Sequence, residues 1–191
     1  MSTSNIGNAS RPTFLRGNEQ AHVVQFYTQD EFLLDGLCEF VRSALSEGES
    51  AVVVVVSKAH RDGLMERLQG CGADVSGAMK NGRCVVVDAA EALSKFMDGG
   101  MPDGKKFESL IGPLIRQGQS AAGGKRVAVF GEMVALLWTE KNFRAALLLE
   151  QLWNELGRTP SYYLRCAYPA RGFQDEKTAN LTRQSAGSIP R

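Results

Sequence analysis

Six consecutive apolar residues, AVVVVV at positions 51 to 56, constrain the fold more than any other part of the chain. β-branched side chains favour extended backbone, and successive side chains of a strand point to opposite faces of its sheet. A strand that is apolar at every position is therefore buried on both faces. Such strands are typical of parallel sheets that helices cover on both sides, so this segment predicts a central strand of an α/β fold.

The rest of the chain alternates between strand and helix patterns. Periodicity and turn residues predict strands over His22–Tyr27, Ala51–Val56, Cys84–Asp88, Arg126–Phe130 and Ser161–Tyr168. Helical patterns begin at Asp30 and cover Lys58–Gln69, Val75–Met79, Ala89–Met97, Phe107–Gln117, Glu132–Trp138 and Asn142–Leu156. Gly112-Pro113 should kink or restart its helix, because proline lacks the N–H that a helix interior needs.

These elements combine into one α/β domain with a doubly wound, mostly parallel sheet of five or slightly more strands and helices on both faces. The pattern does not predict the order of the strands. Residues 1–20 and 171–191 are polar and poor in large apolar side chains. We therefore expect a flexible N-terminal arm and a polar C-terminal tail on either side of a domain at residues 21–170.

Charge and cysteine spacing exclude several classes of function. The formal net charge is +1, which gives no general attraction to nucleic acid or to an anionic membrane. No apolar run approaches the roughly 20 residues that span a bilayer, and no secretory signal is present, so a cytoplasmic protein is expected. The cysteines show no CxxC spacing, so neither a disulfide framework nor a metal site is predicted; they are Cys38, Cys71, Cys84 and Cys166.

The junction after the first predicted strand reads Tyr27-Thr28-Gln29-Asp30-Glu31. In many α/β proteins this junction is a glycine-rich loop that holds a phosphate. Here it contains neither glycine nor lysine, and no GxxxxGK[ST] sequence occurs anywhere in the chain. ATP is therefore not expected, and the sequence identifies no other cofactor. A hydroxyl-rich, acidic junction suits an uncharged or cationic small ligand better than a phosphate.

The chain contains, in this order, HVVQFY, LSEGESAVVVVVSKAHRDGL, GRCVVVDAAEALSKFM, VAVFGEMVALLW, LLLEQLWNEL and LRCAYP. From about His22 to Pro169 it resembles the MEDS family, the sensory domain of methanogens and methylotrophs typified by the dichloromethane-responsive regulator. The resemblance implies a degenerate RecA/KaiC-like fold without a P-loop. It also implies a signalling domain that senses small molecules and is found alone or joined to histidine kinases and transcription regulators.

Open parallel sheets bind their ligands beyond the carboxyl ends of the strands. Polar and aromatic residues predicted to lie there form the candidate ligand-binding set, and no catalytic residue is predicted. The set comprises Tyr27, Thr28, Asp30, Ser57, His60, Asp88, Glu132, Cys166 and Tyr168.

Several of these residues also have a structural interpretation. Asp30 can cap the helix that follows it, and Glu132 can either favour the positive N-terminus of the next helix or contact a ligand. His60 can be a solvated surface residue, and Cys166 can be a small apolar core residue. His22 begins its strand and is expected to be a hydrogen-bonded structural histidine.

Three functions are compatible with these observations. The first is a stand-alone sensory or regulatory domain that binds a small molecule, a partner protein, or both. Its partner would belong to a histidine-kinase, transcription-regulator or sigma-factor pathway. The second is a RecA-like enzyme that binds or hydrolyses nucleotides, and the third is a ligand-free protein-interaction scaffold. The missing P-loop favours the first over the second, so no enzyme is expected, and a homo-oligomer is compatible with all three.

Overall fold

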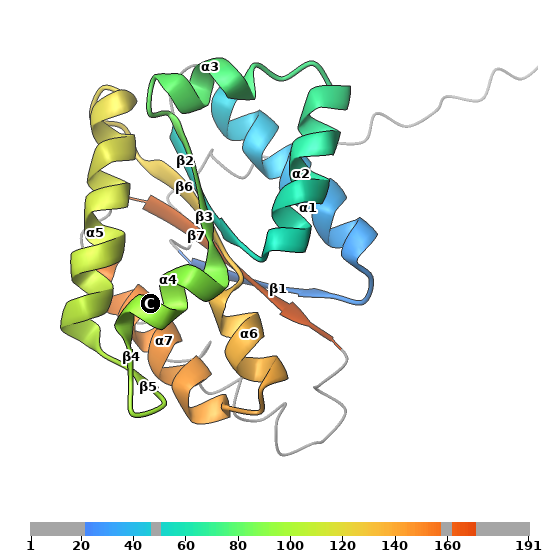
Figure 1. Ribbon diagram of the computed structural model, residues 1–191. Coiled ribbons are helices and arrows are strands. Elements are labelled where there is room, and N and C mark those ends of the chain that lie inside the picture. The colour runs from blue at the N-terminus through green and yellow to red at the C-terminus, as the bar shows by residue number, and fades with distance from the viewer. Residues whose placement is uncertain (1–21, 47–50, 158–161, 171–191) are drawn as a thin grey trace, which may run out of the picture.

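The computed structural model describes residues 22–46, 51–157 and 162–170. One sheet contains the strands β1 (His22–Tyr27), β2 (Ala51–Val56), β3 (Cys84–Asp88), β6 (Val127–Gly131) and β7 (Tyr162–Pro169). The strand order across this sheet is β1, β7, β6, β2, β3. Every neighbouring pair is parallel, as the arrows of Figure 1 show.

β2 has the central, fully buried position that its valine run predicts. All six of its residues are buried, and it pairs in parallel with β6 on one side and with β3 on the other. Its side chains alternate between two hydrophobic clusters: Val53 and Val55 belong to one, whereas Val52, Val54 and Val56 belong to the other. Because both faces are covered, no position of the strand favours a polar residue.

Helices cover both faces of the sheet, which confirms the predicted doubly wound α/β fold (Figure 1). On one face, called the α1–α3 face, lie α1 (Asp30–Ser46), α2 (Lys58–Gly70) and α3 (Val75–Lys80). On the other, called the α4–α7 face, lie α4 (Ala89–Phe96), α5 (Gly104–Ala121), α6 (Met133–Thr139) and α7 (Phe143–Leu156). Each set buries its apolar side chains against its own face, so the sheet separates two hydrophobic clusters.

Helix α5 differs from the sequence prediction. It is a single helix that passes through Pro113 (Figure 1), so of the two alternatives predicted at Gly112-Pro113, a kink or a restart, the restart does not occur. Phe107 and Ile115 are buried on either side of the proline, and this burial offsets the hydrogen bond that the proline cannot donate. The helix also begins earlier than predicted, because the side chain of Asp103 caps it.

A short hairpin lies between α4 and α5 where the sequence predicts only a break. Its strands, β4 (Met97–Asp98) and β5 (Met101–Pro102), pair antiparallel. Gly99 and Gly100 between them have positive φ values of 53° and 80°, which a two-residue hairpin turn of this kind requires. The side chain of Asn142 donates to the carbonyl of Gly100 at 2.8 Å, which ties the hairpin to the start of α7.

The other predicted elements agree with the structure to within about one residue at each end. The predicted arm at residues 1–20 and the predicted tail at residues 171–191 lie outside the described residues. The division of the chain at residues 21 and 170 therefore stays a prediction. Within the described ranges, the structure contains no helix that is both long enough and apolar enough to cross a membrane.

Candidate ligand-binding site

Glu132 is a buried carboxylate at the carboxyl end of β6, with 2% of its surface exposed. Its backbone N–H donates to the carbonyl of Val55 at 2.9 Å, which places it beside the end of β2. Its side chain makes no capping hydrogen bond to α6. Instead, Oε2 accepts from the backbone N–H of Ser57 at 3.0 Å, and Oε1 lies 2.6 Å from Nδ1 of His60. The carboxylate is therefore directed at the start of α2 rather than at its own helix.

His60 lies in the first turn of α2, where the hydroxyl of Ser57 accepts from its backbone N–H at 3.3 Å. Its side chain is 12% exposed, so His60 is not the solvated surface histidine that one interpretation of the sequence allows. Nδ1 faces Glu132, whereas Nε2 lies 3.5 Å from Oδ1 of Asp30, whose side chain is 72% exposed. The ring of Tyr27 meets the imidazole edge-on, with centroids 6.2 Å apart. We call Tyr27, Asp30, Ser57, His60 and Glu132 the carboxyl-edge group.

The charges of this group stabilise the protonated form of His60. The hydrogen bond to Glu132 raises the pKa of His60 above its ordinary value of 6.5; burial opposes this, and the charges of Glu132 and Asp30 add to the rise. Burial and the same two carboxylates raise the pKa of Tyr27, so its hydroxyl keeps its proton and can donate a hydrogen bond. An imidazolium between two carboxylates leaves a net negative charge, which attracts cations and hydrogen-bond donors rather than phosphate.

The other four residues of the predicted set lie outside this group. Thr28 is exposed between β1 and α1. Asp88 caps α4, and its carboxylate accepts from the backbone N–H of Glu91 at 2.9 Å. Cys166 and Tyr168 are buried on the α4–α7 face. The predicted residues therefore do not share one crevice, because Cys166 and Tyr168, two residues apart on β7, both point to the α4–α7 face.

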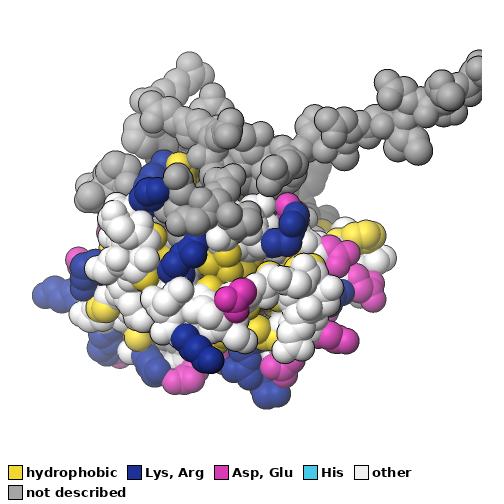
Figure 2. All heavy atoms as spheres, turned by 90° about the horizontal axis from the view of Figure 1, so that it is seen from above, with side chains coloured by type: hydrophobic (Ala, Val, Ile, Leu, Met, Phe, Trp, Pro, Cys, Tyr) yellow, Lys and Arg dark blue, Asp and Glu magenta, His cyan; other side chains and the backbone are white. Residues whose placement is uncertain are grey.

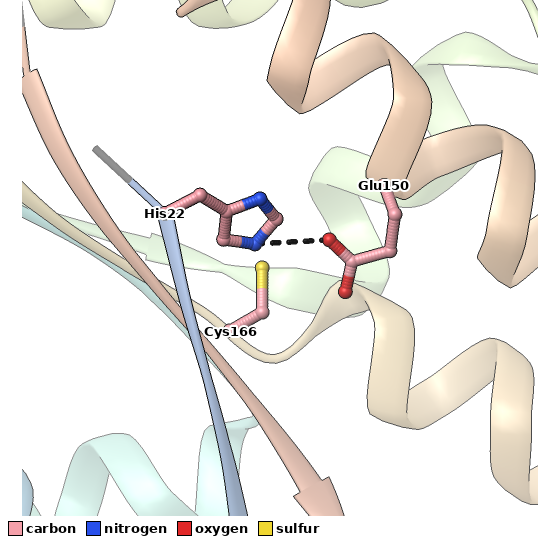
Figure 3. A group of neighbouring side chains, drawn as sticks. All are labelled: His22, Glu150 and Cys166. Carbon is pink, nitrogen blue, oxygen red and sulfur yellow. Dashed lines mark ion pairs between the residues drawn. The ribbon is translucent and has the colours of Figure 1, made fainter. Parts of the chain in front are cut away.

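Cys166 and Tyr168 instead join His22, Glu150 and Asn154 in what we call the α7 group. Nδ1 of His22 lies 2.8 Å from Oδ1 of Asn154, and its Nε2 lies 3.0 Å from Oε2 of Glu150. The hydroxyl of Tyr168 donates to Oε1 of Glu150 at 2.7 Å. Figure 3 shows Sγ of Cys166 directed at the gap between the imidazole and the carboxylate. The hydrogen bond expected for His22 is thus present, at Nδ1.

Glu150 is the functional candidate that the sequence reading does not single out. It lies on the buried face of α7, between Ala146 and Trp153 at helical spacing, and it is 4% exposed. Charged residues are rarely buried so deeply unless they are paired. A carboxylate at a core position of an amphipathic helix is the signal that the sequence offers. Its partners lie on β1 and β7, which the sequence does not place beside α7.

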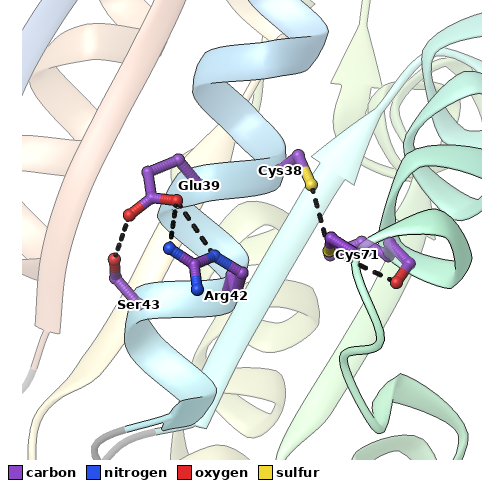
Figure 4. Close-up of polar contacts among 6 residues, drawn as sticks. Cys38, Glu39, Arg42, Ser43 and Cys71 are labelled. Atoms are coloured by element: carbon purple, nitrogen blue, oxygen red, sulfur yellow. Dashed lines mark hydrogen bonds and ion pairs between the residues drawn. The ribbon is translucent and has the colours of Figure 1, made fainter.

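The thiols of Cys38 on α1 and Cys71 after α2 are 3.8 Å apart (Figure 4). Burial and the neighbouring Cys71 raise the pKa of the Cys38 thiol to about 11. Cys71 also lines an open cavity of about 380 Å³, together with Arg42 and Arg83. Because Arg83 immediately precedes β3, this cavity lies at the amino ends of the strands, away from the carboxyl-edge group.

The parallel sheet and the carboxyl-edge group define an α/β domain whose ionisable side chains gather where open sheets bind ligands. A family model described as MEDS, MEthanogen/methylotroph, DcmR Sensory domain, matches residues 21–184. The chain therefore belongs to the MEDS family of sensory domains, as its motifs indicate. A comparison with curated proteins gave no match, and a comparison with solved structures also gave none. The RecA/KaiC-like kinship stays a prediction.

Proposed function

We propose that this sensory domain binds a small uncharged or cationic molecule at the carboxyl-edge group and passes the signal to a partner protein. The observation that carries the proposal is the 2.6 Å contact between the buried carboxylate of Glu132 and His60. A buried ion pair adds little stability compared with apolar residues of the same size, because the loss of hydration offsets the attraction, although removing only one partner is costly. Its place beyond the strand ends, and the perturbed pKa of His60, favour a role in recognition.

The outer side of the group is the part that a ligand can reach. Glu132 is held from within by the N–H of Ser57, whereas the exposed carboxylate of Asp30 approaches His60 from outside. The hydroxyl or ammonium group of a ligand could replace one of the two side chains, Asp30 or His60, in the contact between them. The attraction that favours protonated His60 would then weaken, so ligand binding would be coupled to the charge of the imidazole.

A partner protein would contact the adjacent part of α1. Phe32 lies in the first turn of this helix, two residues after Asp30, and is 64% exposed. Exposed aromatic side chains are common anchors of protein interfaces. The expected partner is a histidine kinase or a transcription or sigma-factor regulator of a cytoplasmic pathway. The same exposed side chain favours the second candidate function, a ligand-free interaction scaffold.

Neither catalysis nor nucleic-acid binding is part of this proposal. Lys and Arg side chains are interspersed with Asp and Glu over the face of the molecule in Figure 2, and the net charge is +1. On this face, such a mixture gives no stripe of positive charge for a phosphate backbone. ATP with Mg²⁺ should leave the melting temperature unchanged, whereas a concentration-dependent rise would favour the RecA-like enzyme.

The proposal is tested by native mass spectrometry of the freshly purified chain, followed by thermal shift with amines, alcohols and halogenated alkanes. At least one compound should raise the melting temperature with concentration, as any ligand specific to the folded state does. The Glu132→Gln variant should lose this rise. Glu66→Gln removes an exposed carboxylate from the helix that carries His60 and should keep it. An unchanged rise in Glu132→Gln would contradict the site, and a partner bound equally with and without every compound would support the scaffold.

A further inference from the structure

We propose that His22, Glu150 and Cys166 bind a divalent transition-metal ion of the zinc class. One nitrogen, one carboxylate oxygen and one sulfur from these residues lie within 4.8 Å of one another. They come from three elements, β1, α7 and β7, which converge on one point of the α4–α7 face (Figure 3). Imidazole, carboxylate and thiolate are the ligands that zinc uses in proteins, and a soft thiolate disfavours magnesium and calcium.

Asn154 determines which nitrogen of His22 is available to a metal. The amide oxygen of Asn154 can only accept a hydrogen bond, and it lies 2.8 Å from Nδ1, so Nδ1 carries the proton. In the neutral ring the lone pair is then on Nε2, the nitrogen next to Glu150. A metal-binding histidine almost always donates its other ring N–H to an oxygen in this way.

Two buried polar atoms in this group lack a hydrogen-bond partner among the described residues: Nε2 of His22 and Oε2 of Glu150. They are 3.0 Å apart, so the two side chains form an ion pair when His22 is protonated. In the neutral ring, Nε2 and the carboxylate oxygen are instead two buried acceptors that repel each other, and leaving both without a donor costs free energy. A cation bonded to both atoms removes that cost.

The remaining contacts prepare the group for a metal. The hydroxyl of Tyr168 occupies Oε1 of Glu150, and Oε2 is the oxygen that faces His22. Sγ of Cys166 supplies the third ligand, and metal binding would release the proton that this buried thiol otherwise carries. Zinc bonds of about 2.0–2.3 Å place ligand atoms roughly 3.3–3.8 Å apart, so small side-chain rotations suffice. Three protein ligands leave the fourth position of a tetrahedral ion for water or an exchangeable small molecule.

The experiment uses the full chain, stripped with EDTA under reducing conditions and titrated with Co²⁺. We expect one equivalent to bind with a thiolate-to-cobalt charge-transfer band in the near ultraviolet and the visible bands of a four-coordinate ion. Zn²⁺ should abolish these bands and raise the melting temperature. Cys166→Ser should lose the charge-transfer band, and Asn154→Ala should weaken Co²⁺ binding about 10–100-fold while leaving all three ligands in place. Cys84→Ser removes another buried cysteine and should behave like the wild type.

Three results would overturn the proposal. The first is a wild-type titration without the charge-transfer band. The second is a band that persists in Cys166→Ser, or that disappears only when Cys38 and Cys71 are replaced, since the metal would then bind that exposed thiol pair. The third is an unchanged Co²⁺ affinity in Asn154→Ala. If Cys166→Ser does not fold, the Co²⁺ affinity of Asn154→Ala is the measurement that tests the proposal. None of these outcomes would contradict the proposed ligand site at the carboxyl-edge group, which shares no residue with the α7 group.

Discussion

Replacing Glu132 by glutamine should destabilise the protein in a pH-dependent manner. Glutamine keeps the size of the side chain and can still accept from the N–H of Ser57, but it removes the charge that lies 2.6 Å from Nδ1 of His60. Because Glu132 is buried, solvent and salt screen this contact weakly. A hydrogen bond to a charged group contributes about 1.5–3 kcal/mol, so we expect a loss of about 2 kcal/mol at about pH 6. For a chain of this size that lowers the melting temperature by about 4–8 °C.

The sign of the pH dependence follows from the pKa of His60. The hydrogen bond to Glu132 raises that pKa above 6.5 in the folded state. The folded protein therefore binds this proton more tightly than the unfolded chain does. The resulting stabilisation is complete below the unfolded pKa of 6.5 and is lost as the pH rises through the folded pKa. The difference in unfolding free energy between wild type and Glu132→Gln should thus be largest at about pH 6 and smallest at about pH 9.

Urea denaturation followed by circular dichroism measures this difference directly, with the unfolding free energy of each protein determined at both pH values. Glu66→Gln is the matched control, because it removes one negative charge from an exposed position on α2. Its effect should stay within about 0.5 kcal/mol. A cost of Glu132→Gln that is the same at both pH values would refute the coupling between Glu132 and His60, and so would an equal cost in Glu66→Gln.

Two further predictions concern α5 and the thiol pair. Pro113→Ala should stabilise the protein by about 1–3 kcal/mol in urea denaturation, because Pro113 is exposed inside a continuous helix and alanine restores the missing N–H; unchanged or lower stability would contradict this. Excess oxidised glutathione should convert the Cys38 and Cys71 thiols, 3.8 Å apart, into a disulfide and release two molecules of reduced glutathione. The reaction should be faster at alkaline pH because the pKa of Cys38 is about 11, and the product should be more stable by about 3–4 kcal/mol. Non-reducing peptide mapping detects the disulfide, and Cys71→Ser is the control. Glutathione adducts without the disulfide would count against the prediction.

The parts of the fold that the sequence predicts are those that local patterns determine. The valine run of β2 predicts burial on both faces because successive side chains of a strand point to opposite faces of its sheet, and every side chain of this run is apolar. The order of the strands depends instead on pairing between distant segments, such as β1 with β7 at the edge of the sheet. No local pattern carries that information. At Pro113, burial of the apolar face of α5 overrides the local preference of proline.

The candidate site divides in the same way. Tyr27, His60 and Glu132 follow directly after strands or begin helices, so the rule that parallel strands end at one edge brings them together correctly. Cys166 and Tyr168 lie within β7. Their contacts depend on which face of the sheet each side chain points to, and not on how far along the strand the residue lies. Glu150 comes from the buried face of a helix and meets them only because α7 packs over β7 and β1.

The carboxyl-edge group and the α7 group meet at the backbone of β6 and β7. Cys166 is paired in register with Gly131, and Gly131 immediately precedes Glu132. A metal ion that draws Cys166 toward His22 and Glu150 would therefore act on the strand neighbour of the residue that positions the buried carboxylate. Two sites are coupled when binding at one changes the free energy at the other, and a coupling of about 1 kcal/mol would change the pKa of His60 by about 0.7. The ring-proton NMR signals of the two histidines report this directly, because His60 is the one histidine of the carboxyl-edge group and His22 belongs to the α7 group. A titration of His60 that is identical with and without Zn²⁺, in protein shown to bind the metal, would establish that the two groups act independently.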